Sequence, residues 1–348
     1  RDVERSRGLG DVYKRQVYNL FQVYNEEILW CSTNNSYSDQ YKMEKRTNPR
    51  DVNSCYGTIG PSQDAVDMFF MGNGLAINDP NSGYDETGFG AVENHCYDPD
   101  YKDKKTDQNI SNMYANREPR FYASVVYQGR SWFKKWMNGN PNYIVDFSAG
   151  GGNDLSNGDN VKTGYMLGKF KNRTVNHASG DTQSWKRVSI IYRLAEFYLF
   201  YAEALNETDP SNPDIIKYID MVRERAGIPG YQTMNDNGIK TGIIGNYDKQ
   251  FDAIQHERYV ELYCEGQRYF DIRRWMICGD KDRIGCDQTR FYGMNMKGSK
   301  DKTPGEPTSY YTRTKVENRQ WTDKLYLYPI HQNVIELANG RIPQNYGW

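Results

Sequence analysis

The fold is decided by residues Gln250 to Trp275, which read Gln-Phe-Asp-Ala-Ile-Gln-His-Glu-Arg-Tyr-Val-Glu-Leu-Tyr-Cys-Glu-Gly-Gln-Arg-Tyr-Phe-Asp-Ile-Arg-Arg-Trp. The stretch contains no proline and one glycine, and it mixes large apolar residues with charges of both signs. This pattern predicts one long helix that is mostly buried.

The charges of this stretch alternate in sign at the spacing of neighbours on a helix surface. They form a ladder that comprises Glu257, Arg258, Glu261, Glu265, Arg268, Asp271 and Arg274. Within it, Arg268 is expected to pair with both Glu265 and Asp271. Glu261 and Glu265 would serve as a general acid and base only if one of them held a proton near neutral pH. Arginine partners lower the pKa of a carboxylate, so we interpret the ladder as structural.

Composition excludes several classes of partner. The 348 residues include 44 basic and 45 acidic side chains, which give a net charge of -1. Such a balance provides no positive field for nucleic acid and no basic face for an anionic membrane. The 29 tyrosines and 7 tryptophans are instead typical of surfaces that hold polar ligands with flat apolar faces, such as sugars.

No metal site or cofactor is expected. The six cysteines contain no Cys-x-x-Cys pair and the four histidines are scattered. Asp98, Asp100 and Asp103 are spaced like a calcium loop, but lysines lie between them and the glycine and final glutamate of such a loop are missing. Cys278 and Cys286 could close a small loop in an oxidising compartment.

Local patterns predict several further elements. Ser62 is expected to cap a short helix that stops at Gly72, and the β-branched and aromatic residues of 120–127 favour a strand. A last short helix is expected at 331–338. Residues 72–118 and 277–322 are expected to be loop, because they are rich in polar and turn-forming residues.

Two helices are predicted from their apolar stripes. The first carries Ile191, Leu194, Tyr198, Tyr201 and Leu205, and the second carries Ile215, Ile219, Val222 and Ala226. Asn212 and Pro213 are expected at the start of the second helix, and Gly227 at its end. Two helices joined by a short turn resemble a tetratricopeptide hairpin, to which the stretch that ends at Trp275 adds a third helix.

Ordered motifs along the chain resemble the SusD/RagB family of outer-membrane nutrient-binding lipoproteins. The motifs are Gly60-Pro-Ser-Gln-Asp64 with Asn73-Gly74, Arg117-Glu-Pro-Arg-Phe-Tyr122, Tyr192-Arg-Leu-Ala-Glu196 with Tyr201-Ala-Glu-Ala-Leu-Asn206, Val222-Arg-Glu-Arg-Ala-Gly227, the charged ladder, and Leu327-Tyr-Pro-Ile330 with Gln344-Asn345. Together they cover about residues 20 to 348. Each motif is weak alone, but six in the family's order are specific.

The resemblance implies a mainly α fold of tetratricopeptide-like helix pairs with long irregular loops and a few short strands. It implies a ligand-binding loop region at 72–184, a helical core at 185–275, and a loop and C-terminal segment at 276–348. Residues 1–16 are expected to be a tail or an artefact outside the family domain at 17–348. The family's signal peptide, lipidated cysteine and first helix repeats have no counterpart in this sequence, which fits a C-terminal portion.

The function implied by the resemblance is capture of a glycan at the outer cell surface, without catalysis. The partner would be a SusC-like, TonB-dependent transporter, and a lipid anchor on the full-length protein would hold it to the outer membrane. Trp132, Phe133, Trp136 and Tyr143 are the expected aromatic platform for the sugar, because they lie in the loop-rich segment before the helix pair. The alternative for these residues is an aromatic cluster buried under a loop.

Other functions remain open from the residues alone. The family also includes peptide-binding members, and a helical-repeat scaffold would bind only protein. A glycoside hydrolase built on an α-helical barrel is a third class, and the arginine-paired ladder argues against it.

Overall fold

The computed structural model describes residues 17–32, 37–52, 55–94, 105–132, 143–156, 158–171, 188–280 and 291–348. Helices dominate, and the strands pair two by two in short antiparallel sheets, so the expected mainly α fold class is confirmed. Within the described ranges, no helix combines the length and the apolar character that crossing a membrane requires.

The elements have the following bounds. The α-helices are α3 (Tyr37–Thr47), α4 (Gln63–Asp67), α5 (Pro119–Ser124), α6 (Leu194–Thr208), α7 (Asp214–Ala226), α8 (Tyr231–Asp236), α9 (Tyr247–Glu261), α10 (Gln267–Arg274) and α11 (Gln332–Leu337), with 3-10 turns η1 (Asn112–Tyr114) and η4 (Asp323–Tyr326). The strands are β1 (Ile28–Ser32), β2 (Phe89–Asn94), β3 (Lys105–Ser111), β4 (Val125–Val126), β5 (Met166–Leu167), β6 (Ser189–Arg193), β7 (Phe291–Met294) and β8 (Arg313–Glu317). They pair as β1–β6, β2–β3, β4–β5 and β7–β8.

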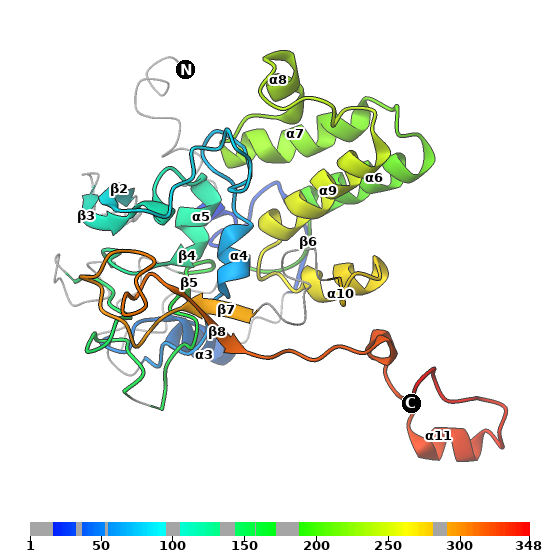
Figure 1. Cartoon of the computed structure of the whole chain (residues 1–348). Coiled ribbons are helices and arrows are strands. Elements are labelled where there is room, and N and C mark those ends of the chain that lie inside the picture. The colour runs from blue at the N-terminus through cyan, green and yellow to red at the C-terminus, as the bar shows by residue number, and fades with distance from the viewer. Residues whose placement is uncertain are drawn as a thin grey trace.

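The helical core consists of α6, α7 and α9, which lie side by side (Figure 1). The predicted stripe of α7 is confirmed, because Ile215, Ile219, Val222 and Ala226 are all buried. Gly227 ends this helix in the left-handed conformation, with φ of 84°, as the sequence predicts.

The predicted start and stripe of α6 are partly wrong. Ile191 belongs to β6, which pairs with β1, so the helix begins only at Leu194. Its buried face carries Ala195, Leu199 and Ala202, whereas Tyr201 is 46% exposed. The strand takes the first apolar positions because its backbone is hydrogen-bonded to β1, a long-range contact that local periodicity does not contain.

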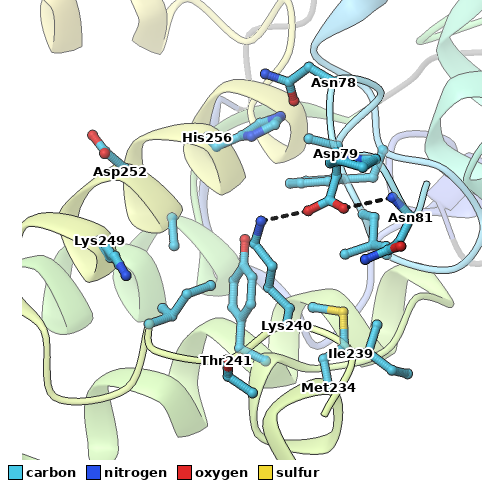
Figure 2. Close-up of a pocket in the computed structure, with 18 residues that line it drawn as sticks. Asn78, Asp79, Asn81, Met234, Ile239, Lys240, Thr241, Lys249, Asp252 and His256 are labelled. Carbon is cyan, nitrogen blue, oxygen red and sulfur yellow. Dashed lines mark hydrogen bonds and ion pairs between the residues drawn. The ribbon is translucent and has the colours of Figure 1, made fainter. Parts of the chain in front are cut away.

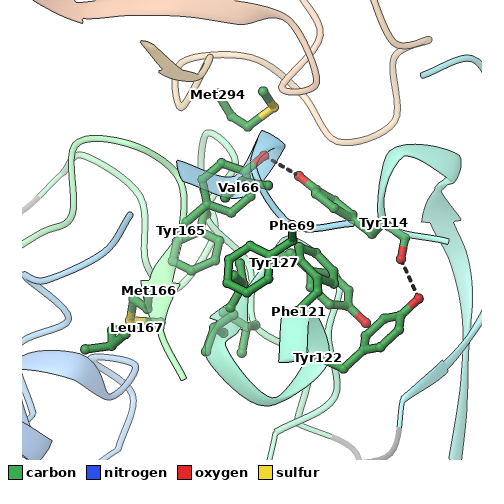
Figure 3. Packing of buried hydrophobic residues seen from close by; sticks show 14 of the residues in the cluster. Val66, Phe69, Tyr114, Phe121, Tyr122, Tyr127, Tyr165, Met166, Leu167 and Met294 are labelled. Carbon is green, nitrogen blue, oxygen red and sulfur yellow. Dashed lines mark hydrogen bonds between the residues drawn. The ribbon is translucent and has the colours of Figure 1, made fainter. Parts of the chain in front are cut away.

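A second core is built largely from tyrosine and phenylalanine (Figure 3). The rings of Tyr114 and Tyr127 stack with their centroids 4.7 Å apart. The Tyr114 and Tyr165 hydroxyls are 3.0 Å apart, and the Tyr165 hydroxyl also donates to Gln63 Oε1 at 2.6 Å. Part of the high tyrosine content therefore serves the core, where the Tyr114 and Tyr165 hydroxyls satisfy each other.

The predicted strand at 120–127 is wrong over most of its length. Residues Pro119 to Ser124 form α5, and only Val125 and Val126 are extended. Pro119 stands at the first helical position, where its fixed φ favours a helix start, and Glu118 before it is extended. All six residues of α5 are buried, so its aromatic residues pack into the second core instead of onto a sheet.

The stretch that decides the fold is two helices and not the predicted single one. The helix α9 ends at Glu261, Cys264 has φ of 60°, and Gly266 has φ of 88° before α10 begins. Both residues are in the left-handed region, which a continuous right-handed helix does not contain. The break turns α10 away from the axis of α9 (Figure 1).

The C-terminal segment leaves the body of the molecule beyond β8 and carries α11 at its far end (Figure 1). This helix confirms the short helix predicted at 331–338, and His331 Nδ1 accepts a hydrogen bond from the Asn333 amide at its start. The predictions of loop at 72–118 and 277–322 are wrong in part, since β2 pairs with β3 in the first segment and β7 with β8 in the second. The predicted cap is confirmed at Ser62, which accepts from the Ala65 amide.

Gly266 provides a test of the helix break. We expect Gly266→Ala to lower the free energy of unfolding by about 1–2 kcal/mol, because a side chain disfavours the left-handed region. The space around Gly266 is open, so the cost comes from the backbone and not from a collision. Gly266→Asn is the matched control and should cost less, since asparagine tolerates this region better. Urea denaturation measures both, and an alanine variant as stable as the original chain would contradict the assigned conformation.

Candidate functional site

Glu257, Glu261 and Glu265 of the predicted ladder lie in a buried ion-pair network centred on Arg193. This arginine is 1% exposed and donates to Glu261 Oε1 at 2.6 Å, to Glu265 Oε2 at 2.7 Å and to Glu27 Oε1 at 2.7 Å. Lys169 adds a second cation, with its ammonium 2.7 Å from Glu265 Oε1. Arg193 thus joins the end of β6 to the connection between α9 and α10.

Arg120 extends this network to the start of α5. It donates to Glu118 at 2.6 Å, to Glu257 at 2.5 Å and to Glu261 at 3.0 Å. Arg223 of α7 reaches the other oxygen of Glu257 at 3.2 Å. The glutamates of α9 therefore bind arginines from β6, α5 and α7.

A separate group of ion pairs holds α10 against α9. Arg258 donates two hydrogen bonds of 3.0 Å to the two oxygens of Asp271. Arg274 donates to Asp271 Oδ1 at 2.9 Å, which is one of the neighbour pairs predicted from the sequence. The predicted role of Arg268 as the joint partner is replaced, because Arg258 and Arg274 hold Asp271, while Arg193 and Lys169 hold Glu265. Arg268 lies over the ring of Tyr259, with its guanidinium carbon 4.4 Å from the ring centroid.

These contacts keep Glu261 and Glu265 ionised. Burial raises the pKa of Glu261, but Arg225 and Arg193 outweigh it and hold that pKa well below its usual range. Burial has the same effect at Glu265, and Arg193 and Lys169 again lower its pKa overall. A carboxylate that stays ionised cannot donate a proton near neutral pH, which agrees with the structural interpretation of Glu261 and Glu265.

Of the predicted aromatic platform, the structure describes Trp132 and Tyr143. Trp132 is 3% exposed and lies in the tyrosine-rich core, which matches the alternative of a cluster buried under a loop. Phe133 and Trp136 lie outside the described residues, as do Asp98, Asp100, Asp103 and Cys286. Tyr143 is half-buried, so part of its side chain is open to solvent, in contrast to Trp132.

Tyr143 lies in a polar cluster formed by two loops. Its hydroxyl donates to Asp51 Oδ2 at 2.5 Å and accepts from Asn153 Nδ2 at 3.2 Å. Burial, and then the hydrogen bond to Asp51, raise the pKa of the Tyr143 phenol well above its usual range. The hydroxyl therefore stays protonated and the ring is fixed in position.

Arg50 links this cluster to a neighbouring hollow of about 500 Å³. The hollow is lined by Arg50, Cys55, Gly158 and Asp159. The Arg50 amide donates to Asn153 Oδ1 at 2.9 Å, and the guanidinium donates to Gly152 O and to Asp154. Charged and amide groups beside a tyrosine ring suit a ligand that combines hydroxyls with an apolar face.

A larger hollow, which the sequence does not indicate, lies between residues 74–81 and α9 (Figure 2). Its volume is about 700 Å³, and a second hollow of about 490 Å³ adjoins it. Both are lined by Ala76, Asn78, Asp252 and His256, so we treat them as one groove and call it the α9 groove. No residue of the predicted platform that the structure describes lines it.

His256 anchors α9 at the back of this groove. Its Nε2 donates to Met68 O at 2.6 Å, and its ring stacks on Phe70 with the centroids 4.1 Å apart. Burial lowers the pKa of the imidazole to about 4, although the hydrogen bond to Met68 acts in the opposite direction. The imidazole is therefore neutral at pH 7.

Comparison with known proteins gives a consistent set of relatives. The model of the SusD family matches residues 26–348. The SusD-like protein P2 from Formosa agariphila is 37% identical over 82 residues, which make up 24% of this chain and 16% of that protein. A solved SusD-like protein from Bacteroides fragilis has a TM-score of 0.66 and 26% identity, with 93% of this chain and 54% of that chain covered.

A second solved protein from Bacteroides fragilis is described as a SusD-like carbohydrate binding protein. It has a TM-score of 0.52 and 23% identity, and the match covers 80% of this chain and 47% of that chain. At this identity the likeness concerns the fold. The chain spans about half the length of these two solved relatives.

The network predicts that removing a buried cation lowers the free energy of unfolding far more than removing an exposed one. Arg193→Met should lower the free energy of unfolding by about 3–5 kcal/mol, because it removes one of the buried cations that Glu261 and Glu265 share. Lys217→Met, which removes an exposed pair with Asp214, should have little effect on stability, because water and salt screen such a pair. Arg193→Lys keeps the charge with fewer donors and should fall between them. Urea denaturation ranks the three, and equal costs for Arg193→Met and Lys217→Met would refute the structural role of the network.

His256 predicts a pH dependence of stability. The unfolded chain binds a proton at this histidine below pH 6.5, the ordinary pKa of an imidazole, whereas the folded chain does so only near pH 4. Stability should therefore fall as the pH drops from 6.5 to 4, by at most about 1.4 kcal/mol per pH unit for this one group.

The contribution of His256 is isolated by two variants. His256→Gln should lose less stability than the original chain over this pH range, because the titrating group is gone. His331→Gln, at the exposed start of α11, should keep the original dependence. Thermal unfolding at about pH 4.5, 5.5 and 7 gives the comparison. Identical pH profiles for His256→Gln and the original chain would show that His256 is not the group responsible.

Proposed function

The chain belongs to the SusD family, and from that premise we propose that it captures an oligosaccharide at the cell surface without changing it chemically and delivers it to a SusC-like, TonB-dependent transporter. The match of the family model to residues 26–348 carries this proposal. The description of one solved relative as a carbohydrate binding protein supports the class of ligand. In the full-length protein, a lipid anchor would hold the domain at the outer membrane.

The chemistry of the described charges supports binding over catalysis. A glycoside hydrolase needs one carboxyl group that is protonated and one that is ionised beside the scissile bond. Glu261 and Glu265 are held by buried cations and both have lowered pKa values, so neither fits the protonated role.

We propose that the sugar binds at the Tyr143 cluster. Tyr143 and Asn153 lie within the proposed ligand-binding region at 72–184, whereas Arg50 and Asp51 precede it. A tyrosine ring packs against the apolar face of a sugar, and the neighbouring Asp51, Asn153 and Arg50 provide acceptors and donors for its hydroxyls. Phe133 and Trp136 are proposed to extend this platform. The burial of Trp132 favours a role for that ring in supporting the loop from below.

The proposal is tested by sugar binding to Tyr143 variants. An oligosaccharide array selects a ligand, and isothermal titration calorimetry then measures its affinity. Tyr143→Ala should weaken binding by about tenfold, which corresponds to about 1.4 kcal/mol. Tyr346→Ala, which removes an exposed tyrosine near the C-terminus, is the matched control and should bind as the original chain does. Chromatography of the incubated sugar should show no product.

Two results would contradict the proposal in different ways. An array with no bound saccharide, or release of a shorter sugar, would contradict the function. Equal affinities for Tyr143→Ala and the original chain would leave the function standing and move the site away from this cluster.

A further inference from the structure

A further hollow lies where β6 meets the break between α9 and α10, and we name it the Glu196 hollow after a glutamate in its wall. Its volume is about 350 Å³, at the lower end of the roughly 300–1,000 Å³ that is usual for ligand sites. Among the described residues, none that lines it also lines the α9 groove or the hollow beside Arg50. The Glu196 hollow is therefore a separate space, and its size suits a small molecule.

Much of the wall of this hollow is apolar. The apolar side chains are those of Phe21, Met43, Phe170, Val188, Ile190 and Ile191. The rings of Phe21 and Phe170 meet edge to face, with their centroids 4.7 Å apart. Phe170 has φ of 69°, an unfavourable conformation for a residue with a large side chain, so the contacts of the folded chain must hold it there. These side chains provide a surface for the apolar part of a ligand.

Glu196, in the first turn of α6, is a charged side chain of this wall with no bonded partner among the described residues. It is 3% exposed. Burial raises its pKa, and the charges of Arg258 and Arg193 act in the opposite direction without cancelling this effect. Arg258 directs its hydrogen bonds to Asp271 instead. The carboxylate of Glu196 therefore lacks a counter-charge at bonding distance.

The network cations Arg193 and Lys169 have no N–H group left for a ligand. Arg193 donates one hydrogen bond from Nε and two from each terminal nitrogen, all to glutamate residues. Lys169, whose ammonium lies 5.0 Å from the centroid of the Phe21 ring, donates to Glu265 Oε1 and to two backbone carbonyls. These bonds use the five donors of an arginine and the three of a lysine. An anion in the hollow would find both cations occupied, whereas a cation would find Glu196 open.

We propose that the Glu196 hollow binds a small organic amine, whose ammonium group donates to Glu196 and whose apolar body packs against Phe21 and Phe170. A hydrogen bond between two charged groups is stronger than one between neutral groups, and it gains further strength away from bulk water. Ser189 and Gln267 also line the hollow and provide neutral polar partners for the remaining N–H groups. This site is separate from the Tyr143 cluster and does not depend on the sugar function.

The proposal is tested by isothermal titration calorimetry with phenethylamine, which joins an ammonium group to one aromatic ring. Two molecules of similar shape are the controls: 2-phenylethanol, which is neutral, and phenylacetate, which is an anion at neutral pH. Phenethylamine should bind at least about tenfold more tightly than either control, because it alone brings a positive charge to Glu196.

The role of Glu196 is isolated by two variants. Glu196→Gln keeps the shape of the side chain and removes its charge, so phenethylamine should bind about tenfold more weakly, or worse, while 2-phenylethanol binds nearly as before. Glu224→Gln, which removes an exposed glutamate of α7 outside the hollow, is the matched control and should bind phenethylamine as the original chain does. Thermal unfolding checks that both variants are folded, as we expect, because Glu196→Gln removes no ion pair between described residues.

Cys264 provides a second readout that requires no substitution. It lines the hollow and is exposed, whereas Cys31 is half-buried and does not line it. Saturating phenethylamine should slow the alkylation of Cys264 by iodoacetamide several-fold and leave the alkylation of Cys31 unchanged. Mass spectrometry of the digested chain measures both rates.

The proposal is overturned if phenethylamine does not bind or if either control molecule binds as tightly. It is equally overturned if Glu196→Gln binds phenethylamine as Glu224→Gln does, or if bound phenethylamine leaves the alkylation rate of Cys264 unchanged. The sugar affinity of Glu196→Gln should equal that of the original chain, so a failure of this proposal is distinguished from a failure of the sugar site.

Discussion

The contact between Arg193 and the glutamates Glu261 and Glu265 is the interaction on which the rest of the structure depends. A buried charge is tolerated only when it is paired and hydrogen-bonded, and Arg193 uses Nε, Nη1 and Nη2 to meet this requirement. By doing so it fixes β6 against the turn between α9 and α10. The backbone of β6 pairs in turn with β1, and Leu194 begins α6 next to the same arginine. The β1–β6 sheet, the start of α6 and the break between α9 and α10 therefore all meet at Arg193.

We propose that ligand binding takes place away from the charged centre. Glu261 and Glu265 of the network are held by buried cations. The proposed sugar site at the Tyr143 cluster lies outside the network, and the α9 groove borders it. Arg223 connects the network to the groove directly, because it bonds both Glu257 and Gly74 O. The helices and strands thus hold the loop residues in fixed positions.

The sequence predicts best where the information is local. The stripe of α7 and its end at Gly227 follow from residues within one helix, and both are confirmed. The break at Gly266 could not be predicted, because one glycine is tolerated in a helix and only tertiary contacts impose its left-handed conformation. Local spacing predicts that the ladder pairs with its own neighbours, yet Glu265 binds Arg193, which is 72 residues away in the chain. Partners that lie so far apart in the chain produce no periodic pattern in the sequence from which their contact could be predicted.

The candidate sites were likewise difficult to predict, because local sequence patterns do not show how residues are placed in the fold. Aromatic content points to Trp132, but composition does not reveal whether a ring faces the core or the solvent, and this ring lies in the core. The α9 groove escapes prediction because residues 74–81 and 239–256 carry no shared motif and meet only in the folded chain. We propose that the charged centre is a scaffold and that the loops bind the sugar. Hydrogen–deuterium exchange with and without the sugar ligand tests it most directly. We expect slower exchange in 50–52 and 143–159 and no change in 257–275, whereas protection confined to 257–275 would contradict it.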